Sequence, residues 1–182
     1  LDSKNTIEVV NSTFLGNEKR NFYGNSLPNK LNVIWKHNLG EGKTTISRRA
    51  GDKNWRGSGW TGQPLLVEEN HHPYIIQGTY SHQLKKIDAV NGKLVWNYNF
   101  GDVIKGTGSI WVNPNPDSLE EALIITQGSR LGYGKYLDNP LVYSFRGISY
   151  FSGKELWRHN CRQTASYSRD VDGSALFIND TG

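Results

Sequence analysis

The chain of 182 residues contains one cysteine, Cys161, and no methionine. A single cysteine excludes a disulfide within the chain and any metal site that needs a cysteine pair. No apolar run approaches the roughly 20 residues of a membrane-spanning helix, so the sequence predicts no membrane span. Lys and Arg number 21 against 17 Asp and Glu, and the basic residues are scattered along the chain. Because nucleic-acid surfaces need clustered basic residues, we expect no nucleic-acid partner.

The short motifs of the common catalytic sites are also missing. The sequence has no nucleophile elbow, zinc-protease helix or phosphate-binding loop, so we predict no catalytic residues and no metal site. His71 and His72 would point to opposite faces of a strand and precede Pro73 in an expected hairpin loop, which favours solvated side chains over metal ligands. The chain starts at Leu1, which indicates either a removed leader or a cut boundary. A removed leader would place the protein outside the cytoplasm, periplasmic or secreted.

Aromatic residues and glycine are plentiful: six Trp, nine Tyr and 20 Gly favour half-buried strands joined by tight turns. A short pattern recurs along the chain and ends in Trp35, Trp96 and Trp157, which are spaced 61 residues apart. Short β-type runs lie between these tryptophans, four in each unit. We expect strands near residues 64–68, 73–78, 84–90, 93–98, 109–112, 122–128, 141–145 and 155–158.

Four short strands per unit, with one glycine turn and one tryptophan each, predict an all-β chain of β-propeller blades, each a four-stranded antiparallel sheet. Residues 1–30 would form an N-terminal segment that precedes the blades, and residues 31–182 would form the blades. The polar, glycine-rich stretches 40–59 and 129–140 are predicted to be loop insertions. Only 25 residues follow Trp157, so we expect about two and a half to three blades and an incomplete ring.

The segment that contains Asp88, Gly92 and Trp96 resembles the tryptophan-docking motif of the PQQ-like (quinoprotein alcohol dehydrogenase-like) propellers. The second copy keeps Gly153 and Trp157 but has a serine at the aspartate position. In such a motif the indole covers the turn of a neighbouring blade, and its N–H reaches a carbonyl. We therefore expect structural roles for Trp35, Asp88, Gly92, Trp96, Gly153 and Trp157.

The resemblance implies that ligands lie in a central funnel, near the start of each innermost strand. The candidate ligand-binding residues are Trp60, Gln63, His82, Thr107, Arg169 and Asp170. Two structural alternatives stay open: Trp60 could pack under a long loop, and Arg169 could pair with Asp170 or Asp172.

Two functions follow from the resemblance. The first is a non-catalytic propeller that binds a protein or glycan partner and needs no cofactor. The alternative is the N-terminal part of a PQQ-dependent or related oxidoreductase, which would use PQQ with or without calcium. Quinone-dependent members carry an adjacent cysteine pair that this chain lacks, which favours the first. Further blades, from a C-terminal part or from another copy, are also expected partners.

Overall fold

The computed structural model describes residues 6–21, 24, 28–47, 49–131, 141, 143–161 and 170–178. The chain is all-β, with antiparallel sheets of five, four and two strands. No helix in these ranges is long and apolar enough to cross a membrane.

The five-stranded sheet has the order β1-β4-β5-β6-β7. Its strands are β1 (Ile7–Asn11), β4 (Leu65–Glu69), β5 (His72–Gly78), β6 (Gln83–Asp88) and β7 (Leu94–Asn99). Asn70 and His71 form the two-residue connection between β4 and β5, and both have positive φ, 52° and 64°. Such a pair twists in the sense that a two-residue hairpin requires.

The four-stranded sheet has the order β11-β10-β9-β8. Its strands are β8 (Ser109–Val112), β9 (Leu123–Gly128), β10 (Phe145–Ser149) and β11 (Glu155–His159). The short helix α1 (Leu119–Ala122) precedes β9 directly. Every residue of β9 is buried, which explains its continuous apolar start rather than an alternating pattern.

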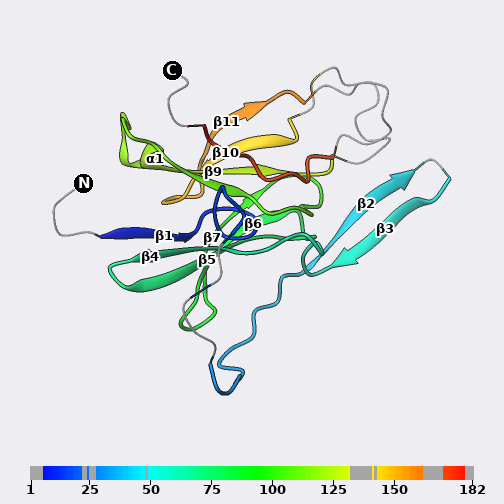
Figure 1. Ribbon diagram of the computed structural model, residues 1–182. Coiled ribbons are helices and arrows are strands. Elements are labelled where there is room, and N and C mark those ends of the chain that lie inside the picture. The colour runs from blue at the N-terminus through cyan, green and yellow to red at the C-terminus, as the bar shows by residue number, and fades with distance from the viewer. Residues whose placement is uncertain are drawn as a thin grey trace.

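One apolar core joins these two sheets, which Figure 1 shows stacked on each other. Leu65, Ile76 and Leu84 of the first sheet belong to the same buried cluster as Ile125 and Ile148 of the second. Two sheets that pack face to face in this way bury the inward side chains of both.

Strands β2 (Glu41–Ser47) and β3 (Gly51–Arg56) form a separate hairpin that projects to the side of the stacked sheets (Figure 1). Trp55 packs edge-on against Tyr80, with ring centroids 5.1 Å apart. The Nη2 of Arg130 donates to the Ile46 carbonyl at 3.2 Å. These two contacts attach the hairpin to the rest of the chain, one near its base and one near its turn.

Three sequence predictions are wrong at this level. The first unit has five strands rather than four, because β1 pairs antiparallel with β4. The stretch 40–59 contains the β2–β3 hairpin rather than a plain loop. Most of its residues are polar, and apolar residues do not alternate along either strand, so the sequence did not indicate strands here. The strand expected at 141–145 instead spans Phe145–Ser149, where Gly147 lies beneath the Trp157 indole.

Candidate functional site

Trp35 and Trp96 make the same contacts with successive turns. The indole Nε1 of Trp35 donates to the Ala89 carbonyl at 2.8 Å, and that of Trp96 donates to the Tyr150 carbonyl at 3.0 Å. Each ring also lies on a glycine of that turn. A Cβ atom on Gly92 would come within 2.7 Å of the Trp35 ring, and one on Gly153 within 2.8 Å of the Trp96 ring.

The two glycine turns are closed by equivalent hydrogen bonds. Gly92 N donates to the Asp88 carbonyl at 2.8 Å, and Gly153 N donates to the Ser149 carbonyl at 3.0 Å. The Asp88 carboxylate accepts from Val90 N at 2.8 Å, and the Ser149 hydroxyl accepts from Phe151 N at 3.3 Å. The Ser149 side chain thus accepts the turn hydrogen bond that the Asp88 side chain accepts 61 residues earlier.

The environment of the Asp88 carboxyl favours its charged form. Burial opposes ionisation, but backbone N–H donors and the nearby His72 outweigh it and lower the pKa of Asp88. The His72 Nε2 lies 3.0 Å from the Asp88 Oδ2. His72 therefore has a carboxylate neighbour within the sheet rather than a cluster of metal ligands.

A basic side chain in β6 and another in β10 each donate to two backbone carbonyls that follow the preceding tryptophan in sequence. Lys85 Nζ donates to the carbonyls of Asn38 and Leu39 at 3.3 and 3.4 Å. Arg146 Nη1 and Nη2 donate to the carbonyls of Asn99 and Phe100 at 3.4 and 3.2 Å. Lys85 and Arg146 are 61 residues apart, so this contact repeats with the tryptophan period.

Trp157 differs from the other two tryptophans in what surrounds it. Its ring packs on Gly147 of the neighbouring strand and on Phe145, with ring centroids 5.8 Å apart. The part of the chain that the structure describes contains no third glycine turn beneath it.

The segments that precede β4 and β8 and the segment 170–178 are also linked in series. The Thr107 hydroxyl donates to the Thr61 carbonyl at 2.7 Å, and the Ser174 hydroxyl donates to the Thr107 carbonyl at 2.9 Å. Gly106 lets these backbones approach, because a Cβ atom there would lie 2.1 Å from the Asp172 carbonyl oxygen. Three segments distant in sequence therefore meet beside the starts of β4 and β8.

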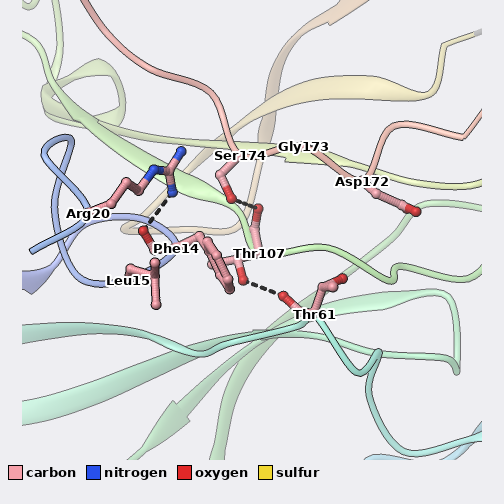
Figure 2. Close-up of a pocket in the computed structure, with 8 residues that line it drawn as sticks. All are labelled: Phe14, Leu15, Arg20, Thr61, Thr107, Asp172, Gly173 and Ser174. Atoms are coloured by element: carbon pink, nitrogen blue, oxygen red, sulfur yellow. Dashed lines mark hydrogen bonds between the residues drawn. The ribbon is translucent and has the colours of Figure 1, made fainter.

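A cavity of about 420 Å³ opens at this meeting point (Figure 2). Its size falls in the range of small-molecule sites in proteins. The loop after β1 supplies one wall, and the three linked segments supply the other. The lining residues are Phe14, Leu15, Arg20, Thr61, Thr107, Asp172, Gly173 and Ser174.

Arg20 contributes the positive charge of the cavity wall. Its Nη1 donates to the Phe14 carbonyl at 2.6 Å and reaches the Thr13 hydroxyl at 3.4 Å. The guanidinium carbon lies 5.7 Å from the centroid of the Phe14 ring. Figure 2 shows Arg20 beside Phe14, with the carboxylate of Asp172 pointing away from it.

The acidic residues near the cavity are paired with Lys105. Its Nζ lies 2.5 Å from the Asp170 Oδ2 and 2.7 Å from the Asp172 Oδ2. Burial raises the pKa of Asp170 to about 6; Lys105 opposes this shift, and the neighbouring Asp172 carboxylate adds to it. Burial also disfavours the charged Lys105, but the two carboxylates outweigh it and raise its pKa.

The predicted ligand-binding residues lie in three different settings. Thr107 lines the cavity, and Gln63 supports its wall, because its side-chain oxygen accepts from Leu15 N at 2.9 Å. Asp170 pairs with Lys105 behind the cavity. Trp60 is 92% exposed, so the alternative that it packs under a loop is wrong.

His82 does not line the described cavity. The His82 Nε2 lies 2.9 Å from the Lys43 carbonyl oxygen, against the β2–β3 hairpin. Arg169 lies outside the described residues. The alternative that Arg169 pairs with Asp170 or Asp172 stays open, although Lys105 already bridges both carboxylates.

Sequence reasoning missed the residues of the loop after β1. Phe14, Leu15 and Arg20 lie in the opening stretch, which resembles the start of the PQQ-like propellers, but they belong to no repeat and were not among the predicted ligand-binding residues; the fold brings them to the cavity. Lys85 and Arg146 were also missed, although their 61-residue spacing was available. Among the described residues, no group of three His, Cys, Asp or Glu side chains could hold a metal ion.

Comparisons of the chain with protein-family models, with curated proteins and with solved structures found no match.

Proposed function

We propose that this chain is a non-catalytic module of the PQQ-like β-propeller kind that binds a protein or glycan partner at the cavity, outside the cytoplasm. The observation that carries the proposal is the junction of Thr61, Thr107 and Ser174. Three segments linked in series, two of which precede β4 and β8, border the cavity, and the funnel of a propeller would lie at a junction of this kind.

The repeated contacts support the propeller part of the proposal. Trp35 binds the first sheet as Trp96 binds the second, and the same rotation from unit to unit would build a ring. Among the described residues, the segment before Trp35 pairs with no strand, and Leu31, Val33 and Ile34 are 90%, 76% and 78% exposed. In a ring, this segment would be the outer strand of a further blade, from the same protein or from another copy.

The binding test uses a substitution that fills the cavity without straining the backbone. Gly173 lines the cavity, its φ is not positive, and a Cβ atom there meets open space. We expect that Gly173→Leu abolishes binding to the glycans or peptides that the wild type recognises on an array. The control is Lys53→Leu on the exposed hairpin, which should bind as the wild type does. Equal binding by Gly173→Leu would place the binding surface elsewhere.

The wild-type protein and Gly173→Leu also distinguish the proposed binding function from the oxidoreductase alternative. Titration with PQQ, with and without calcium, should leave the quinone absorbance unchanged, and a dye-coupled assay should detect no oxidation of alcohols or sugars. A quinone-dependent oxidation that Gly173→Leu removes would favour the oxidoreductase.

A further inference from the structure

From the cavity wall we infer that the ligand carries a carboxylate attached to an apolar group, with Arg20 binding the carboxylate. This inference rests on the proposed binding role of the cavity and names the chemistry of what binds. It differs from the predicted set of funnel residues, because Arg20 comes from the loop after β1.

The guanidinium of Arg20 lines the cavity without an acidic partner among the described residues. No described carboxylate forms an ion pair with it, and its only side-chain hydrogen bonds come from Nη1, so Nε and Nη2 donate to no described residue. An arginine in this state offers two adjacent N–H groups, which match the two oxygens of a carboxylate. A carboxylate could therefore accept hydrogen bonds from Nε and Nη2 of Arg20.

The acidic groups nearby do not cancel this charge. Lys105 is shared by Asp170 and Asp172, and the Asp172 side chain points away from Arg20 (Figure 2). Burial raises the pKa of Asp170 to about 6, so protonation reduces the negative charge on this side only at more acidic pH. An anion is thus favoured over a cation on the Arg20 side.

The rest of the wall favours an apolar group over a sugar. Phe14 and Leu15 are large apolar side chains exposed at the cavity. The hydroxyls of Thr61, Thr107 and Ser174 each donate their hydrogen to a backbone carbonyl. A neutral glycan would need several free donors and acceptors, whereas a carboxylate with an apolar group needs the guanidinium and an apolar surface.

The two sources of such a ligand are a free small acid and the C-terminus of a polypeptide. The first probe is 3-phenylpropionate, compared with 3-phenylpropanamide, which has the same shape and no charge. The second is a tetrapeptide that ends in phenylalanine, with a free or an amidated C-terminus. Binding is measured by calorimetry and by chemical-shift changes in the full chain.

We expect the free acid of each pair to bind about 10-fold or more tightly than its amide. Arg20→Gln should remove this preference without changing the weak binding of the amide, and Arg20→Lys should keep part of it. Arg56→Gln, an exposed arginine paired with Glu41 on the hairpin, should leave it unchanged. Binding of the tetrapeptide acid but not of 3-phenylpropionate would identify the polypeptide as the source.

Two results would overturn the inference: equal affinity for acid and amide in the wild type, or an acid preference that survives Arg20→Gln in a folded protein. The wild-type comparison needs no variant, so it stands even where a substitution disturbs the loop. A glycan that binds, and that Gly173→Leu displaces, would reject the carboxylate and keep the proposed binding function.

Discussion

Two glycines carry the contact between successive sheets at the residue scale. Gly92 and Gly153 have φ of 74° and 73°, a conformation that side chains disfavour. Each also lies under an indole, so a side chain would be excluded by space as well as by backbone conformation. The energetic cost of the positive φ can be separated from that of the clash with the indole, because Gly51 has a positive φ and no atom near an added Cβ.

We predict that Gly153→Ala lowers the free energy of unfolding by about 2–4 kcal/mol, since it adds a clash with the Trp96 ring to the cost of the positive φ. Gly51→Ala is the matched control: its φ is 64° and nothing lies within 4 Å of the added Cβ, so about 1 kcal/mol is expected. Urea unfolding of both variants measures the difference. Equal losses would mean that the indole does not press on Gly153.

At the element scale, the sequence predicted some of the strands but not others. The 61-residue period predicted the tryptophan strands β7 and β11, because tryptophan and the glycine turn are written in the sequence. It did not predict β1, since pairing with β4 depends on a chain reversal that no local pattern encodes. The hairpin β2–β3 was not predicted for a related reason: it has only two large apolar residues, Ile46 and Trp55, which are too few to form an alternating pattern.

The cavity could be predicted only in part. Thr107 was predicted because the family resemblance implies ligands near the start of each innermost strand, and it lines the cavity. Phe14 and Arg20 were not found, because a single loop outside the repeat carries them to the cavity. Lys85 and Arg146 were missed although they obey the period, whereas His82 was predicted as a ligand-binding residue but lies against the hairpin.

The basic side chain that recurs at positions 85 and 146 predicts which substitution of Arg146, in β10, the protein tolerates. Lysine at position 85 already binds two carbonyls as arginine does at position 146. Arg146→Lys should therefore cost less than about 1 kcal/mol. Arg146→Met leaves the carbonyls of Asn99 and Phe100 without this donor and should cost about 2–3 kcal/mol. Thermal and urea unfolding decide this, and a larger loss for lysine than for methionine would contradict the repeat.

The pH dependence of stability, at the scale of the whole molecule, should contain a contribution from Asp170. Burial raises its pKa from 3.8 to about 6, so between about pH 4 and pH 6 the folded protein holds a proton that the unfolded chain has released. The free energy of unfolding then falls as pH rises through this window. The expected fall is about 2 kcal/mol, after allowance for partial exposure.

Asp170→Asn removes the titrating group and keeps its shape. The stability of the wild type minus that of the variant should therefore fall between pH 4 and pH 6 and be flat above it, as measured by urea unfolding at fixed ionic strength. A difference that rises with pH would mean that Lys105, rather than burial, sets the pKa of Asp170.

The central claim is that Trp35 and Trp96 occupy equivalent places in successive units. Hydrogen–deuterium exchange of the indole N–H groups tests it most directly, with the six tryptophan signals assigned by single Trp→Phe variants. The account predicts slow exchange at Trp35 and Trp96, whose N–H groups donate to backbone carbonyls, and fast exchange at Trp60, which is 92% exposed. Fast exchange at either Trp35 or Trp96 would contradict it.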